Sequence, residues 1–463
     1  MSHPSKTTAG GGTRRLMTVL FIGVFMAALD TAVIGPAIPA LRAAFGVDNR
    51  QVGLVMIVFI LFALSSTALM ANLSDRHGRR PIYMTSISLF ALGSLVIALA
   101  PAFWTVVLGR AIQGIGAGGI IPTASAVIGD ELPQEQHGRA LGLIGAVYGM
   151  AFVLGPPLAA GLMVALSWHW IFLLNLPIAA IILYLGARAL PPRRPAHALP
   201  PLDVPGIVLV FATLSALVLG ITRVADTFTG MTLWPWLLVA ALALLAVLIP
   251  VERRARQPMI PLSLFAKKAL RTTYLLAVGG GFGMGSVIFL TSIATLAYGV
   301  APDKSGFVLL PMVVCSMVGS MGAGRMLNRT GPRVQLLAGF TLLAVGYGAS
   351  AITGYGLWAF LIASVPVGLG LGIVVGGAMR SIAIDEAPAE LRATAQGLIN
   401  ISNSIGTLLS AATISAIADF RGGGADGFAA AYAVVATLLA VMIVVATRLD
   451  GRRGGGLNSR ARH

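Results

Sequence analysis

One acidic residue of this chain differs from all the others in its surroundings. Asp30 lies inside a long apolar stretch, whereas the remaining Asp and Glu residues fall in polar segments or at the ends of apolar ones. An ionisable group inside such a stretch is costly and usually has a function. Burial favours the protonated form of a carboxyl group, and a nearby cation favours the ionised form. Asp30 could therefore take up and release a proton, or it could only hydrogen-bond a neighbouring helix.

Arg110 is the cation best placed to pair with Asp30. If both stretches are helices that cross a membrane in opposite directions, a rise of ~1.5 Å per residue puts Asp30 roughly 12 Å and Arg110 roughly 10 Å from one membrane face. A direct or water-bridged pair is then possible, and protonation of Asp30 would break it. Alternatively, Arg110 binds backbone carbonyls or extends to the surface. We expect Arg380, near the end of its own stretch, to extend to the surface.

The composition is that of a membrane protein. Of 463 residues, 57% are hydrophobic and only 10% are charged, and the mean hydropathy is +0.89. These values exclude a soluble enzyme, a disordered tail and a nucleic-acid-binding domain. The six histidines and the single cysteine, Cys315, show no metal-ligand spacing. We therefore expect no catalytic residues, metal, cofactor or nucleic-acid partner, and the lipid bilayer is the surrounding medium.

Apolar runs of about 20 residues, the length needed to cross a bilayer, occur fourteen times. An all-α integral membrane protein with fourteen transmembrane helices is therefore expected. The approximate limits of the runs are 15–38, 51–71, 81–100, 103–129, 138–163, 168–188, 204–222, 232–251, 271–297, 305–327, 334–353, 357–384, 393–418 and 427–447.

The basic residues predict the orientation of these helices. With fourteen crossings, 25 of the 32 Lys and Arg residues fall on the side of the two termini. Lys and Arg concentrate in cytoplasmic loops, so both termini are predicted to be cytoplasmic. The net charge of +16 is then a topology signal and requires no nucleic acid. A multi-pass protein of the inner, cytoplasmic membrane of a bacterium is expected.

Two halves of the chain repeat each other at a nearly constant offset of 253 to 255 residues. The segment Ala71–Arg80 aligns with Gly324–Arg333, and Asp130–Glu135 aligns with Asp385–Glu390. Parallel six-helix repeats with a substrate site between them are a transporter design. The predicted segments are a cytoplasmic tail at 1–13, a six-helix bundle at 14–190, two inserted helices at 203–251, a second six-helix bundle at 267–447 and a cytoplasmic tail at 448–463.

Several motifs resemble those of the major facilitator superfamily. Asn72–Arg80 is similar to its loop between helices 2 and 3, Leu108–Gly116 to its proton-coupling motif, and Gly145–Gly161 to its antiporter motif. The helix 1 segment Leu29–Pro39, the segment Trp168–Pro177 and the two extra helices resemble the fourteen-spanner drug:proton antiporters. This resemblance implies a major facilitator fold that works by alternating access, with Asp30 and Arg110 as the proton-coupling residues.

The loop and helix 5 motifs supply two further groups of expected site residues. A gating loop that locks one face closed is expected at Asp75, Arg76, Gly78, Arg79 and Arg80, with a second copy at Asn328, Arg329, Gly331 and Arg333. The second lock should be weaker because Asn328 replaces Asp75. A seam of close helix approach is expected at Gly145, Gly149, Gly155 and Pro156. The alternatives are an ordinary basic loop and ordinary membrane-helix glycines.

A polar helix face and some apolar side chains are the candidates for lining a substrate cavity. Spacings of three and four residues put the polar groups of 400–407 on one face, where hydrogen bonds between helices are the alternative role. Flexible apolar side chains could provide adaptable contacts. The candidates are Phe25, Met26, Gln113, Tyr148, Asn400, Asn403, Ser404 and Thr407.

The predicted function is proton-coupled efflux of amphipathic, often cationic, drugs or toxic compounds by a monomer. The proton is the expected coupling ion because of Asp30 and the antiporter-like helix 5, and ATP is not expected as the direct energy source because the chain contains no nucleotide-binding P-loop. A dedicated exporter of one metabolite, such as an antibiotic or a siderophore, is the first alternative, and it would have a more polar, charge-paired cavity. An integral membrane enzyme would require a cluster of His, Asp or Cys at one face.

Overall fold

The computed structural model describes residues 9–47, 49–192, 203–222, 233–255, 258, 260–300, 308–352, 356–422 and 424–449. Every regular element within these ranges is a helix. Eleven of the helical segments there are long and apolar enough to cross a membrane, and Pro205–Ile221 is a shorter apolar helix. The expected all-helical membrane fold is thereby confirmed.

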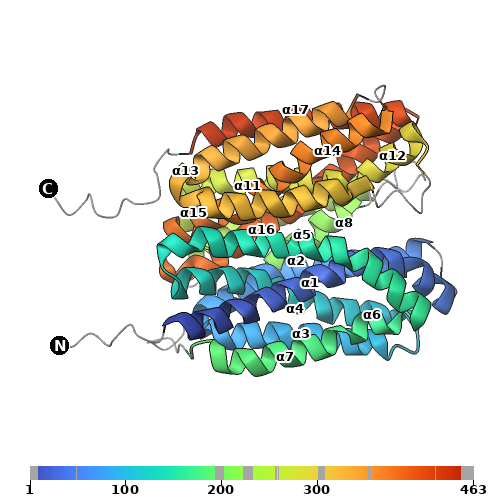
Figure 1. The fold of residues 1–463 in the computed structure, drawn as a ribbon. Coiled ribbons are helices and arrows are strands. Elements are labelled where there is room, and N and C mark those ends of the chain that lie inside the picture. Colours follow the sequence, from blue (N-terminus) through green and yellow to red (C-terminus); the bar gives the residue numbers. More distant parts are fainter. Residues whose placement is uncertain are drawn as a thin grey trace, which may run out of the picture. The chain divides into compact units, whose positions relative to one another are not determined.

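The chain divides into two compact units, and α5 contributes to both of them. The first unit comprises Met1–Pro133 and Leu154–Leu199. Its helices are α1 (Ala9–Phe45), α2 (Asn49–His77), α3 (Arg79–Ala98), α4 (Phe103–Glu131), the second half of α5 (Gln134–Ala165), α6 (His169–Leu173) and α7 (Asn175–Ala189). In Figure 1, α3 lies beside both α4 and α7, and α4 also packs against α2.

The second unit comprises Gln134–Val153 and Pro200–His463. Besides the first half of α5, its elements are α8 (Val204–Thr222), α9 (Trp234–Arg254), α10 (Ser263–Ala266), α11 (Lys268–Ser286), η2 (Val287–Phe289), α12 (Leu290–Tyr298), α13 (Leu310–Ser350), α14 (Gly356–Ile373), η5 (Val374–Ala378), α15 (Met379–Glu386), η6 (Ala389–Leu391), α16 (Arg392–Phe420) and α17 (Ala425–Thr447). Here α13 packs against α14 and α17, and α11 packs against α16 (Figure 1). α8 pairs with α9.

Some expected helices are longer or more broken than the apolar runs indicate. α1 begins at Ala9, so part of the expected 1–13 tail is helical, while 1–8 and 450–463 lie outside the described residues. The run 357–384 is interrupted by the π-helical turn η5, where Gly376 leaves helical geometry at ψ −130°. The grouping of Gln134–Val153 with the second unit also differs from the expected 14–190 bundle.

The repeated loop motif forms the same backbone turn in both units. Gly78 has φ 97° and ψ 160° between α2 and α3, and Gly331 has φ 76° and ψ 159° inside α13. Only glycine adopts this region readily. Gly331 divides α13 into two helices, which correspond to the expected runs 305–327 and 334–353. The sequence repeat is therefore also a repeat of structure.

A glycine ladder brings equivalent helices into close contact in each unit. Its glycines at 114, 116 and 118 recur at 368, 370 and 372, an offset of 254 residues. A Cβ atom added at Gly114 would lie 2.7 Å from the carbonyl oxygen of Phe59 on α2, and one added at Gly368 would lie 2.1 Å from that of Met312 on α13. Small residues allow such backbone approaches inside a membrane. The middle glycines, Gly116 and Gly370, similarly face α3 and the second half of α13, at Phe90 and Gly339.

Substitution of Gly331 tests the importance of the turn for stability. Gly331→Ala places a Cβ atom where a residue other than glycine costs about 1–3 kcal/mol, so we expect a lower Tm for the purified protein in detergent. Gly322→Ala is the matched control, because Gly322 lies on the same helix and an added Cβ meets nothing within 4 Å. An unchanged Tm for Gly331→Ala would contradict the requirement for glycine.

Candidate functional site

The structure brings Asp30 and Arg110 together in the interior of the first unit. Arg110 Nη1 donates to Asp30 Oδ2 at 2.7 Å, and the two side chains are 1% and 0% exposed, Arg110 first. α1 supplies the carboxylate and α4 supplies the guanidinium. The direct pair expected from their depths is thus present, whereas the proton-coupling role stays a prediction.

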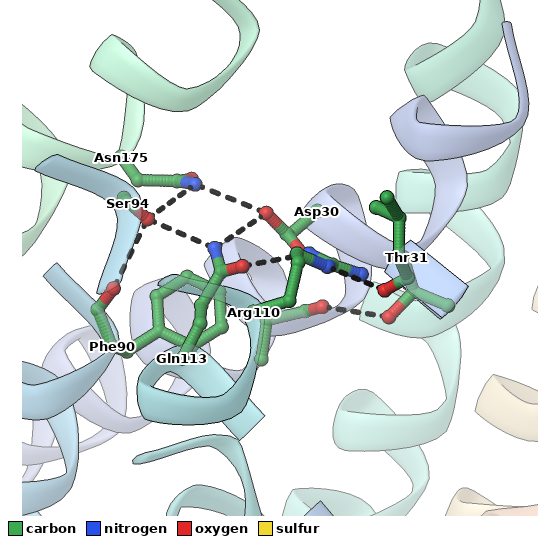
Figure 2. Close-up of polar contacts among 9 residues, drawn as sticks. Asp30, Thr31, Phe90, Ser94, Arg110, Gln113 and Asn175 are labelled. Atoms are coloured by element: carbon green, nitrogen blue, oxygen red, sulfur yellow. Dashed lines mark hydrogen bonds and ion pairs between the residues drawn. The ribbon is translucent and has the colours of Figure 1, made fainter. Parts of the chain in front are cut away.

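Three uncharged polar side chains surround this ion pair (Figure 2). Gln113, one helical turn after Arg110, accepts from Arg110 Nη1 at 2.6 Å and donates to Asp30 Oδ1 at 2.7 Å. Asn175, at the start of α7, donates to Asp30 Oδ1 at 3.3 Å and to Ser94 Oγ at 3.1 Å. Gln113 Nε2 also donates to Ser94 Oγ, on α3, at 2.9 Å. Four helices therefore meet around one carboxylate.

Arg110 has further partners on α2. Its Nε donates to the carbonyl oxygen of Val55 at 3.1 Å, and its Cζ lies 4.1 Å from the centroid of the Phe59 ring. A cation over an aromatic face is attracted by the ring quadrupole, more strongly when water is excluded. Because of these partners and Gln113, Arg110 stays partly satisfied if the charge on Asp30 is lost.

The contacts of Asp30 limit what protonation can do. Its three side-chain partners, Arg110, Gln113 and Asn175, all present N–H donors to the carboxylate. A protonated carboxyl group has an O–H donor of its own, and a guanidinium has no acceptor. A proton on Oδ2 would point a donor at Arg110. Proton uptake on this oxygen must therefore separate the pair or rotate a side chain.

The candidates for lining a substrate cavity have varied positions, and their role in binding a substrate stays a prediction. Gln113 is fully buried within the ion-pair network, and Met26 is fully buried in the core of the first unit. Phe25 is half-buried on α1, and the side chain of Tyr148 lies outside the described residues.

The polar face of α16 makes hydrogen bonds between helices. Asn400 accepts from Arg380 Nη2 at 3.1 Å, and the Thr407 hydroxyl donates to the carbonyls of Gly281 and Asn403, each at 3.1 Å. Asn403 and Ser404 are half-buried on the same face. Arg380 is only 5% exposed, so the expectation that it extends to the surface is wrong. This face supplies polar contacts to α15 and α11.

The first gating loop is held by ion pairs. Arg79 pairs with Asp75 one turn earlier, and its Nε lies 2.9 Å from Asp130 Oδ2 at the end of α4. Gly78 forms the turn between Asp75 and Arg79, and Arg76 and Arg80 are half-buried beside it. The loop thus ties three helices of the first unit together.

The second copy of the loop has a different set of contacts. Asn328 donates to the carbonyl of Glu135 at 2.6 Å, while Arg329 is exposed and Arg333 is half-buried. Proline occupies position 332, the equivalent of Arg79. The arginine that bridges two carboxylates in the first loop is therefore missing from the second.

The glycines of α5 make close contacts where their surroundings are described. A Cβ atom at Gly155 would lie 2.6 Å from the Cβ of Ala32 on α1, and one at Gly145 would lie 2.3 Å from Ser320 Oγ on α13. Gly149 and Pro156 lie on α5 outside the residues whose side chains are described. The two described glycines support the expected seam.

Four residues that surround the Asp30–Arg110 pair or contact Arg79 were not predicted as site residues from the sequence. Asn175 is a polar residue in the otherwise apolar start of a helix, a signal that could have identified it. Asp130 belongs to the repeated loop after α4 and could have been considered as a partner of Arg79. Ser94 and Phe59 carry no such signal, because their residue types are ordinary in apolar helices.

Comparison with known proteins establishes the family. The sequence profile of the Major Facilitator Superfamily matches residues 20–411. The chain belongs to the major facilitator superfamily. Members of this superfamily are multi-pass membrane transporters that act on small molecules and are not enzymes, and the helical architecture agrees with the assignment.

Bacterial members of the superfamily are the most informative relatives. The chain is 30% identical over 403 residues to the uncharacterized transporter YfiU of Bacillus subtilis, covering 85% of this chain and 77% of YfiU. It is 29% identical to the multidrug transporter protein MdtP of the same organism, covering 72% of this chain and 61% of MdtP. It is 28% identical to the tetracenomycin C resistance and export protein of Streptomyces glaucescens, covering 91% and 79%.

Solved structures agree on the superfamily fold. The human organic anion transporter MFSD10 aligns with a TM-score of 0.70 at 16% identity, covering 94% of this chain and 99% of that one. The proton:xylose symporter XylE aligns with a TM-score of 0.68 at 15% identity, covering 93% and 94%. At these identities the similarity concerns the fold alone.

A double-mutant cycle tests whether Asp30 and Arg110 act as a pair. Removing one member of a buried ion pair costs about 3–5 kcal/mol, so we expect Arg110→Met to lower the free energy of unfolding by up to about this amount. Addition of Asp30→Asn should recover much of the loss, because no carboxylate then lacks its cation. Additive losses in thermal or denaturant unfolding would contradict the pairing.

Proposed function

We propose that this chain is a proton-coupled exporter of amphipathic, often cationic, compounds, of the fourteen-spanner drug:proton antiporter type. The observation that carries the proposal is the buried Asp30 side chain, whose carboxyl oxygens lie against Arg110 and accept from the N–H donors of Arg110, Gln113 and Asn175. The coupling ion is the proton, and no other cofactor is required.

The arrangement around Asp30 suits a group that alternates between two protonation states. In the ionised state its oxygens accept from Arg110, Gln113 and Asn175, and these bonds join α1 to α4 and α7. In the protonated state the contact with Arg110 is lost, while Arg110 keeps the Val55 carbonyl and the Phe59 ring. The proton therefore changes how α1 is held, which is the property needed to bias an equilibrium between two conformations.

Export as the direction of transport is supported by the relatives and by α5. MdtP is named a multidrug transporter, and the Streptomyces relative is named for resistance and export. The antiporter-like glycines Gly145 and Gly155 make close contacts in the structure.

A dedicated exporter of one metabolite is the second candidate function. The tetracenomycin C exporter covers 91% of this chain, a larger share than MdtP does. Its name connects it with one antibiotic. The polar face of α16, with Asn400, Asn403 and Thr407, would then recognise a defined polar group rather than a range of compounds.

We further propose fourteen membrane crossings, with both termini in the cytoplasm and the protein a monomer in the inner membrane. Eleven helical segments qualify as crossings. Gly331 divides one of them, α13, into two helices that can each cross the membrane, which raises the number of crossings to twelve. The helices α5 and α8, of 32 and 19 residues, supply the remaining two. The excess of Lys and Arg on the side of the termini supports the orientation.

Transport in proteoliposomes tests the proton coupling. With an imposed pH gradient and the cationic dye ethidium, native protein should move dye and protons in opposite directions. Asp30→Asn should reduce gradient-driven dye flux to the level of protein-free liposomes, because the group that binds the proton is gone. Asp426→Asn removes an exposed carboxylate at the start of α17 and serves as the control with native flux.

The outcomes separate the candidate functions. Gradient-driven dye flux retained in Asp30→Asn would contradict the role of this carboxylate. No dye flux with native protein, combined with proton release on addition of a single antibiotic, would favour the dedicated exporter.

Labelling of single cysteines tests the orientation. In a Cys315→Ala background, Leu233→Cys and Arg254→Cys place a thiol at either end of α9. The positive-inside rule predicts that a membrane-impermeant maleimide added to intact cells labels the first variant, and labels the second only after the cells are broken. The reverse pattern would contradict cytoplasmic termini.

A further inference from the structure

A small cavity on the second unit carries a concentration of positive charge that the transport mechanism does not use. It has a volume of about 210 Å³ and is lined by Arg139 and Leu143 of α5 and by Met321 and Arg325 of α13. Both helices belong to this unit over these residues. No carboxylate is among the lining residues.

The two arginines lie at one level because α5 and α13 run antiparallel through a tight contact. Ser320 donates to the carbonyl of Gly142 at 2.7 Å, and Asn328 donates to that of Glu135 at 2.6 Å. Successive residues of α5 therefore lie beside successively earlier residues of α13. In this register Arg139 faces Arg325, and one turn further into the membrane Leu143 faces Met321.

Two arginines that line one small cavity from facing helices repel each other. Arg139 and Arg325 are both exposed and form no ion pair within the part of the chain that the structure describes. The backbones of Gly138 and Gly324 approach closely, and the hydrogen bonds from Ser320 and Asn328 join the two helices on either side of this contact. An anion between the two guanidinium groups would remove the repulsion.

The surroundings select the kind of anion. Guanidinium groups match the oxygens of a phosphate through paired hydrogen bonds. Below the arginines, Leu143 and Met321 form an apolar floor, and Val314 and Val318, further along α13, are 52% and 59% exposed. A ligand that satisfies both parts has a phosphate attached to hydrocarbon chains.

We propose that Arg139 and Arg325 bind the phosphate of an anionic phospholipid, whose acyl chains lie along Leu143 and the exposed apolar face of α13. In the proposed topology both arginines lie on the cytoplasmic side, where the Lys and Arg excess occurs, and anionic headgroups bind basic pockets between helices on that side. The proposal rests on the membrane location of the chain and not on its proton coupling.

Lipid retention by the full-length protein tests the proposal directly. Native mass spectrometry is performed on protein purified in detergent and titrated with phosphatidylglycerol or with phosphatidylcholine. We expect the native protein to bind phosphatidylglycerol in preference to phosphatidylcholine. Arg139→Gln/Arg325→Gln should bind phosphatidylglycerol at least about tenfold more weakly, since each basic residue contributes to anionic-lipid affinity. Arg253→Gln/Arg254→Gln removes the same charge from the exposed end of α9 and should bind like the native protein.

Further arms separate the sources of phosphate and guard against misfolding. Inorganic phosphate at millimolar concentration should not displace the lipid; displacement would overturn the lipid assignment in favour of a free anion. Arg139→Lys/Arg325→Lys keeps the charge and should bind more strongly than the glutamine variant, with the native Tm. Equal adduct loss in both double glutamine variants, or none in either, would overturn the proposal, and neither result bears on proton coupling.

Discussion

The cost of holding a charge away from water governs the interior of the first unit. Asp30 and Arg110 are almost fully buried, and such charges persist only with good geometry and further hydrogen bonds. This requirement for hydrogen-bond partners explains why α2, α3, α4 and α7 all direct a polar atom or an aromatic ring towards the pair. The packing of α1 depends on this network, as does the proposed response to a proton.

The two halves of the repeat share a scaffold but not this chemistry. Both have the glycine turn and the glycine ladder, so both build equivalent helix contacts. At the ladder offset of 254, however, Ser364 occupies the position of Arg110, and its hydroxyl donates to the carbonyl of Leu361 within its own helix. A duplicated frame in which the first unit has the Asp30–Arg110 pair and the repeat position of Arg110 is a serine suits the proposal that one half carries the proton and the other contributes polar contacts.

The sequence was sufficient for features that rest on strong local rules. A carboxylate in an apolar run is rare enough to single out Asp30, and helix rise alone placed Arg110 at its depth. The turn at Gly331 followed from its alignment with Gly78. The role of Gln113 could not be predicted, because a polar residue beside a cavity and one beside a buried ion pair look alike in sequence. Arg380 and the division of α5 between two units depend on tertiary packing, which no local pattern encodes.

The most direct test of the account is whether the proton resides on Asp30. Infrared difference spectra between neutral and acidic buffer would be recorded for native protein and Asp30→Asn in lipid. Acidification of the native protein should produce a C=O band of a buried protonated carboxyl group with loss of a carboxylate band, and Asp30→Asn should lack both changes. Identical spectra for the two proteins would contradict a proton-dependent Asp30–Arg110 pair.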